Sequence, residues 1–155
     1  MKPLNRQRNM VVRLVVICVL CVSAARGQDS EKKVKMRDLP EAVKTTVREQ
    51  SKGATIRGLA RETENGQTSY EVELKINGHN RDVLIDPNGG VLAIEEEVAI
   101  NSLPPAVKTE LVRKAGKGRI LSVESITKNG VLVEYEAQVR TAGKRSEINV
   151  SADGK

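Results

Sequence analysis

The stretch Leu39-Pro-Glu-Ala-Val-Lys-Thr45 recurs in the second half of the chain as Leu103-Pro-Pro-Ala-Val-Lys-Thr109. Six of the seven positions are identical, at an offset of 64 residues. Self-similarity at a fixed period indicates a duplicated structural unit. The sequence therefore predicts two tandem copies of one fold, and each copy begins near this motif.

The similarity continues downstream at an offset of 65 residues. Ser69-Tyr-Glu-Val-Glu-Leu74 aligns with Glu134-Tyr-Glu-Ala-Gln-Val139, and Asp86-Pro-Asn-Gly89 aligns with Ser151-Ala-Asp-Gly154. Because matches occur at the start, middle and end of each copy, we expect repeat 1 to span residues 38–97 and repeat 2 to span residues 98–155.

Each copy is expected to open with a helix. Asp38 stands where an N-cap is favoured, and Glu41 follows three residues later, as in a capping box. Ser102 is expected to be the N-cap of the helix in the second copy. The residues at helical spacing that should face a core are Leu39, Ala42, Val43 and Val47 in the first copy, and Leu103, Ala106, Val107 and Leu111 in the second.

Strands are expected after each helix. Tyr70, Val72, Leu74 and Ile76 alternate with charged residues, which is the pattern of a half-buried strand. Asn-Gly pairs mark tight hairpins between such runs. The predicted fold class is α+β, with one helix in each repeat packed on a three- to four-stranded antiparallel meander. The expected strands are 56–62, 70–76, 81–86 and 91–94 in the first repeat, and 120–127, 131–140 and 146–150 in the second.

Two polar segments carry no strand or helix pattern. Residues 28–37 are polar, with Glu31, Lys32, Lys33 and Lys35, and are expected to be a flexible lead-in. Glu95-Glu-Glu97 is expected to be a solvated linker between the repeats, because adjacent residues on a strand point to opposite faces and cannot converge on a cation.

Residues 1–27 have the pattern of a secretory signal peptide: a basic start, an apolar run from Leu14 to Ala25 and small residues at its end. The uncharged run is too short for a membrane-spanning helix. An uncleaved anchor that extends through Arg13 is the alternative. We expect the mature protein to start between Ala25 and Gln28, a periplasmic or secreted location, and no stable membrane insertion afterwards.

The charge of the chain argues against a nucleic-acid partner. Lys plus Arg number 26 and Asp plus Glu number 20, for a formal net charge of +6. Five of the basic residues precede residue 28, which leaves 21 basic and 20 acidic residues beyond the leader. With Trp 0, Phe 0 and Tyr 2, there are also few aromatic side chains on which bases could stack.

Catalytic, metal-binding and cofactor-binding patterns are not recognised in the sequence, so we expect no enzyme activity and no cofactor. His79 is the single histidine and is expected to be an exposed hairpin residue. Both cysteines lie in the leader. Asp86-Pro-Asn-Gly89 shares its opening with a calcium loop but lacks the glycine and glutamate spacing, which favours a simple turn.

The order of these motifs, found twice over residues 36–155, resembles the PepSY-like family, in particular its secreted tandem form described as beta-lactamase-inhibitor-like. The resemblance implies a secreted or periplasmic protein that binds, and inhibits or regulates, another protein. It carries over no catalytic residue. The chain departs from the related inhibitor in having no cysteine beyond the leader and only Tyr70 and Tyr135 as aromatic residues.

We therefore expect an exported, non-enzymatic module that binds a protein or peptide, with a secreted peptidase or other hydrolase as the partner that the resemblance implies. A small-molecule or ion-binding envelope sensor and a purely structural envelope protein are the alternatives. Tyr70 and Tyr135 share the phase of the core residues, which favours packing over contact with a partner. The expected binding surface is the outward face of the sheet, formed by Glu71, Glu73, Lys75, Leu132, Glu134, Glu136, Gln138 and Arg140.

Overall fold

The computed structural model describes residues 30–155, so the predicted signal peptide and its cleavage site lie outside the described residues. Within this range the strands form one antiparallel sheet in sequence order, β1 to β8. The elements are β1 (Ser30–Lys33), η1 (Met36–Asp38), α1 (Glu41–Gln50), β2 (Thr55–Glu64), β3 (Gln67–Ile76), β4 (His79–Ile85), β5 (Val91–Glu97), η2 (Ile100–Ser102), α2 (Pro105–Ala115), β6 (Arg119–Lys128), β7 (Val131–Thr141) and β8 (Lys144–Ser151).

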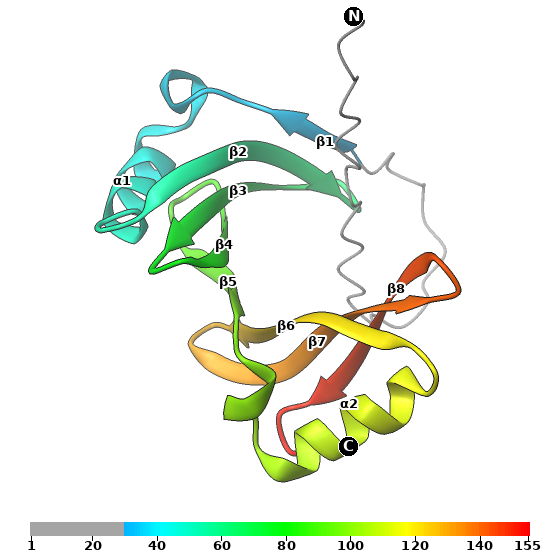
Figure 1. Cartoon of the computed structure of the whole chain (residues 1–155). Helices are drawn as coiled ribbons and strands as arrows, with labels where there is room; N and C mark the ends of the chain where they lie inside the picture. The colour runs from blue at the N-terminus through cyan, green and yellow to red at the C-terminus, as the bar shows by residue number, and fades with distance from the viewer. Residues whose placement is uncertain (1–29) are drawn as a thin grey trace, which may run out of the picture.

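The predicted α+β class and the duplication are confirmed. Helix α1 precedes the meander β2–β5, which we call unit 1, and α2 precedes the meander β6–β8, which we call unit 2 (Figure 1). The two meanders are continuous, because β5 of unit 1 pairs with β6 of unit 2. The sheet is strongly curved, and the two helices lie on its outside (Figure 1).

Each helix covers a separate core. In unit 1 the buried residues are Leu39, Val43, Val47, Val72, Leu74, Val83 and Ile85. In unit 2 they are Leu103, Val107, Leu111, Val123, Tyr135, Ala137 and Val150. Tyr70 packs against the first cluster and Tyr135 belongs to the second, so both tyrosines lie beneath the helix of their own unit, as predicted.

The helix starts differ from the predicted capping boxes. The N-cap residues are Pro40 and Pro104, and neither helix has a side-chain cap. Asp38 instead ends η1, where its amide donates to the Lys35 carbonyl. Ser102 ends η2 and its hydroxyl donates to the Ala99 carbonyl at 2.7 Å. Pro fixes its own φ near the value that a helix entry requires, so it sets the start without a capping side chain.

The structure explains why the motifs at the start and end of each unit recur together. Ala42 and Ala106 are exposed rather than buried in the core as predicted. A Cβ added to Gly89 would lie 2.8 Å from the Ala42 carbonyl oxygen, and one added to Gly154 would lie 2.7 Å from the Ala106 Cβ. The glycine turn after the meander therefore sits directly against the first turn of the helix, and both sides of this contact need small residues.

Two segments predicted to lack regular structure are strands. Ser30–Lys33, in the expected flexible lead-in, form β1 and pair with residues 60–63 of β2. Glu95–Glu97, the expected linker, belong to β5 and pair with residues 124–126 of β6. Main-chain hydrogen bonds to a neighbouring strand hold both segments, and these bonds leave no trace in the pattern of side chains.

Candidate functional site

One face of the sheet carries both helices. Leu74 belongs to the core under α1 and Tyr135 to the core under α2. A row of cross-strand pairs on one face joins them, through Leu74, Arg81, Glu96, Ser125 and Tyr135. The opposite face, which we call the open face, is therefore not covered by α1 or α2 (Figure 1).

The register assigns seven of the eight predicted site residues to the open face. Those on β3 are Glu71, Glu73 and Lys75, and those on β7 are Glu134, Glu136, Gln138 and Arg140. Glu73 and Arg140 are exposed, whereas the other five are half-buried. The two groups are separated by β4, β5 and β6, so they occupy different halves of the face rather than one contiguous site.

Leu132 departs from this set. The pairing of β6 with β7 shifts between Ile126 and Thr127, so Glu134 pairs with Ile126 but Leu132 pairs with Thr127. A bulge adds one residue to one strand of a pair and reverses the alternation beyond it. Leu132 is thereby taken out of phase with the other predicted residues, and strict alternation over 131–140 could not reveal this shift.

Carboxylates dominate the open face. The register places twelve acidic and six basic side chains on it. The acidic residues are Glu31, Glu62, Glu64, Glu71, Glu73, Asp82, Glu95, Glu97, Glu124, Glu134, Glu136 and Glu147, and the basic residues are Lys33, Lys75, Arg119, Lys128, Arg140 and Arg145.

Several of these carboxylates were missed by sequence reasoning. Asp82, Glu95, Glu97 and Glu124 lie on β4, β5 and β6, between the two predicted groups. Asp82 and Glu124 are buried, with 9% and 6% of their surface exposed. The available signal is an acidic residue at the outward position of an apolar strand. The sequence predicts a linker at Glu95–Glu97, and it carries no local sign that β5 pairs with β6.

The acidic groups of distant strands influence one another. Burial raises the pKa of the Glu62 carboxyl, and the charges of Glu31, Glu95 and Glu64 raise it further, against a lowering hydrogen bond with Glu71. Glu62 is on β2 and Glu95 on β5, which would lie about 14 Å apart in a flat sheet. Their interaction is consistent with the curvature of the sheet, which brings β2 and β5 closer together than in a flat sheet (Figure 1).

Side chains of the face make contacts with both charged and neutral groups. Lys128 lies 3.4 Å from a Glu134 carboxylate oxygen. Lys75 donates to the Asn80 side-chain oxygen at 3.2 Å rather than to a carboxylate. The Glu97 carboxylate accepts the Asn80 backbone amide at 3.0 Å. With twelve acidic and six basic side chains, the face has an excess of acidic over basic residues.

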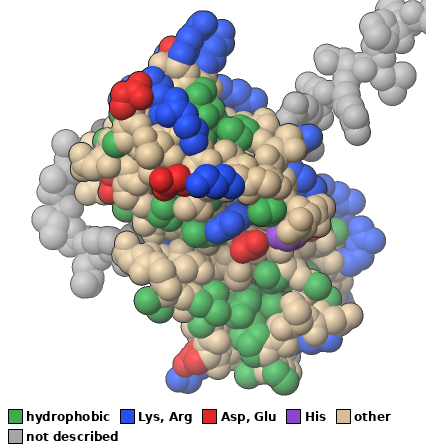
Figure 2. All heavy atoms as spheres, turned by 90° about the vertical axis from the view of Figure 1, so that its left-hand side faces the viewer, with side chains coloured by type: hydrophobic (Ala, Val, Ile, Leu, Met, Phe, Trp, Pro, Cys, Tyr) green, Lys and Arg blue, Asp and Glu red, His purple; other side chains and the backbone are tan. Residues whose placement is uncertain are grey.

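An exposed apolar group lies at the tip of the β6–β7 hairpin, where Val131 is on the open face and Leu132 is on the opposite face. Val131 is 64% exposed, Leu132 39% and Leu92 37%. Val131 pairs with Lys128 of the open face, and the amide of Asn129 donates to the Leu92 carbonyl, so the three residues surround one turn. We call this group the apolar rim. Figure 2 views the molecule from the hairpin side and shows hydrophobic side chains gathered over unit 2.

His79 is not the exposed hairpin residue that was predicted. It is half-buried, and its Nε2 lies 3.0 Å from a Glu96 carboxylate oxygen on β5. Figure 2 shows the imidazole beside an acidic side chain at the level where the two units meet. This contact links the side chains of β4 and β5 next to the junction of the units.

The Asp86 carboxylate is used within its own turn, where it accepts hydrogen bonds from backbone amides. One Asp86 carboxylate oxygen accepts the amides of Asn88 and Gly90, at 2.6 and 3.0 Å. Among residues 30–155, no group of three or more His, Cys, Asp or Glu side chains is arranged to hold a metal ion. In the same range, no helix has the length and apolar character needed to cross a membrane.

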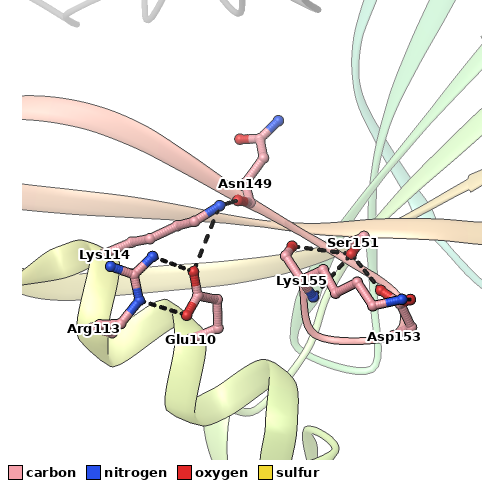
Figure 3. Close-up of polar contacts among 7 residues, drawn as sticks. All are labelled: Glu110, Arg113, Lys114, Asn149, Ser151, Asp153 and Lys155. Atoms are coloured by element: carbon pink, nitrogen blue, oxygen red, sulfur yellow. Dashed lines mark hydrogen bonds and ion pairs between the residues drawn. The ribbon is translucent and has the colours of Figure 1, made fainter.

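Helix α2 also secures the outer strand β8 (Figure 3). The Lys114 ammonium donates to the Asn149 carbonyl at 2.6 Å, while Glu110 pairs with Arg113 on the helix surface. Beyond β8, hydrogen bonds from Lys155 and then from the Ser151 hydroxyl lower the pKa of Asp153 to about 2. These contacts hold the edge of the sheet on the helix side.

Comparison with known proteins agrees with this architecture. Residues 39–92 match the PepSY family, described as the peptidase propeptide and YPEB domain. The match begins at Leu39, before α1, and ends in β5, so it covers almost all of unit 1. No curated protein sequence matches the chain.

Several solved structures share the fold. A protein provisionally described as periplasmic, from Bacteroides eggerthii DSM 20697, aligns with a TM-score of 0.61 at 16% identity, over 76% of this chain and 84% of that chain. A DUF2874 family protein from Bacteroides uniformis ATCC 8492 gives 0.59 at 17% identity, over 75% and 84%. A BLIP-like protein from Bacteroides fragilis NCTC 9343 gives 0.55 at 23% identity, over 76% and 82%. These alignments include both units, so the tandem arrangement is shared as well.

Proposed function

Because residues 39–92 form a PepSY domain, we propose that this chain is an exported, non-enzymatic module that binds a protein or peptide through the open face. Both the PepSY match and the BLIP-like fold belong to proteins that are generally non-catalytic. The provisional periplasmic description of a structural relative supports a location outside the cytoplasm. The peptidase-propeptide character of the PepSY family supports an extracytoplasmic peptidase or other hydrolase as the protein that is inhibited or regulated.

The observation that carries the proposal is the composition of the open face. Like charges placed side by side across strands destabilise a sheet. Sequences that fold well violate such rules mainly at functional sites. An open face with twelve carboxylates, maintained across both units, is therefore better explained by binding than by folding.

Site-specific photocrosslinking tests this proposal. A photoreactive residue is placed at Gln138, which is half-buried on the open face, and in a matched variant at Val112, which is exposed on α2. The proposal expects the Gln138 variant to form a discrete covalent adduct with a protein of the cell envelope, and the Val112 variant to form none.

Mass spectrometry of the adduct then identifies the partner. A loss of hydrolytic activity when the purified partner is mixed with the chain would support the inhibitory role. Adducts from Val112 alone, or equal adducts from both positions, would contradict binding through the open face.

A further inference from the structure

We propose that the partner segment bound on the open face is a protein segment rich in lysine and arginine; this inference rests on the proposed function. Two rows of three acidic residues adjoin one another across neighbouring strands. Glu73, Asp82 and Glu95 form the row on β3, β4 and β5, and Glu97, Glu124 and Glu136 form the row on β5, β6 and β7. The two rows meet on β5, so the acidic surface crosses the junction between the units.

The charge is a property of this face rather than of the whole molecule. Beyond the leader the chain holds 21 basic and 20 acidic residues, whereas the open face holds six and twelve. The remainder of the molecule is consequently basic. A chain that is nearly neutral overall but strongly acidic on the face opposite its two helices has the charge distribution that attracts a cationic surface in one orientation.

The curvature of the sheet strengthens this field. Carboxylates on β2 and β5 affect each other, as the raised pKa of Glu62 shows, so the negative potential of several strands adds within the concave surface. Concave, like-charged surfaces concentrate counter-charges more strongly than flat ones. A flexible segment with several Lys or Arg residues could place one cation near each acidic row.

The chemistry of the face excludes other classes of partner. Nucleic acids and anionic membranes are repelled by a surface with this excess of carboxylates. A small cation or polyamine would satisfy the charge but would leave the exposed Val131, which lies on the open face opposite Lys128, without a contact. Exposed apolar side chains beside a charged surface are typical of contacts with another protein. A basic protein segment with apolar residues matches both features.

Titration with synthetic peptides tests the inference on the protein lacking its leader. The probe is a twelve-residue peptide of alternating lysine and valine, and its controls replace every lysine with glutamine or with glutamate. The variant Glu73→Gln/Glu97→Gln removes two charges from the open face, one from each acidic row. The variant Asp38→Asn/Glu49→Gln removes two exposed charges from the helix side.

The expected result is that only the lysine peptide binds, and that 0.5 M salt weakens binding. The open-face variant should bind about threefold to tenfold more weakly, and the helix-side variant should bind as the parent does. Equal binding of the lysine and glutamine peptides, or an equal effect of both variants, would overturn the inference. Displacement of the peptide by spermine at equal charge concentration would overturn it in favour of a polyamine site.

These outcomes separate the inference from the proposed function. If photocrosslinks from Gln138 capture a partner whose crosslinked segment is neutral or acidic, the open face binds protein but the basic partner is wrong. If no open-face crosslink forms while the lysine peptide still binds in the expected way, the acidic chemistry stands and the envelope partner is wrong.

Discussion

At the scale of single residues, Gly89 provides the sharpest test of why the repeat motif persists. Its φ is +88°, and an added Cβ would meet the Ala42 carbonyl oxygen at 2.8 Å. Gly66 in the β2–β3 hairpin has a similar φ of +80° but no atom within 4 Å of an added Cβ. Gly66→Ala should cost about 1 kcal/mol through backbone strain alone, whereas Gly89→Ala should cost about 2–4 kcal/mol through strain and steric overlap. Chemical denaturation measures both, and equal losses would contradict the role of the helix contact.

The Glu62 carboxyl makes a second prediction at this scale, on pH dependence. Its pKa is raised in the folded protein, first by burial and then by the charges of Glu31, Glu95 and Glu64. The folded state therefore binds the proton more tightly than the unfolded state does, and stability falls as pH rises through the range between the two pKa values. Because Glu62 is only about half-buried, the effect is screened and should reach about 0.5 kcal/mol at most.

Glu62→Gln should accordingly raise the melting temperature at pH 7, and the gain should shrink to zero below pH 4, where the parental carboxyl is protonated in both states. Glu49→Gln, on the exposed side of α1, serves as the control and should show no such pH-dependent gain. A gain that persists unchanged at pH 3 would indicate that charge is not its cause.

At the scale of elements, the equivalent helices should contribute comparably to stability. Val43 in α1 and Val107 in α2 are both 0% exposed, whereas Val112 in α2 is 54% exposed. Val→Ala should cost about 1–3 kcal/mol at either buried position through lost burial and a residual cavity. The same change at Val112 should alter the free energy of unfolding by less than about 0.5 kcal/mol. Urea denaturation compares the three, and a large loss at Val112 would contradict the assignment of the buried helix face.

The same elements show how far the sequence could be interpreted. The alternation of Tyr70, Val72 and Leu74 predicts β3, and the repeated motif predicts both helices. Both predictions are possible because burial of one face of an element gives a periodic pattern of apolar residues in the sequence. β1 could not be predicted in this way. All four of its residues are exposed, and backbone pairing with β2 holds them. Likewise, Asp38 is a residue type that is common at N-caps, but Pro40 is the N-cap residue and sets the start of α1.

The candidate surface was partly predictable for the same reason. Glu71, Glu73 and Lys75 followed from the outward phase of one strand. Asp82 and Glu124 joined them only through the register between strands and the union of the two meanders, which are non-local pairings. The bulge that displaces Leu132 is likewise set by strand pairing and not by local pattern.

At the scale of the whole molecule, the continuity of the sheet predicts that the two units unfold together. Each unit has about 60 residues, a size at which a single domain is only marginally stable. Separation of the units would expose the facing edges of β5 and β6, break the hydrogen bond from the Val98 amide to the Val123 carbonyl, and open five paired positions. Neither core is large enough to compensate, so we expect one cooperative thermal transition.

The two tyrosines allow each unit to be followed separately. Tyr70 lies in unit 1 and Tyr135 in unit 2, and the chain has no tryptophan. In Tyr135→Phe the remaining tyrosine fluorescence reports on unit 1, and in Tyr70→Phe it reports on unit 2. In each of these proteins the fluorescence midpoint should coincide with the midpoint from circular dichroism. Adding Val107→Ala in unit 2 should lower both midpoints of the Tyr135→Phe protein together, although its fluorescence probe lies in unit 1. If instead the Tyr70 signal kept its original midpoint while unit 2 melted earlier, the sheet would be two domains in contact rather than one folding unit, and an acidic surface that spans them would depend on their docking.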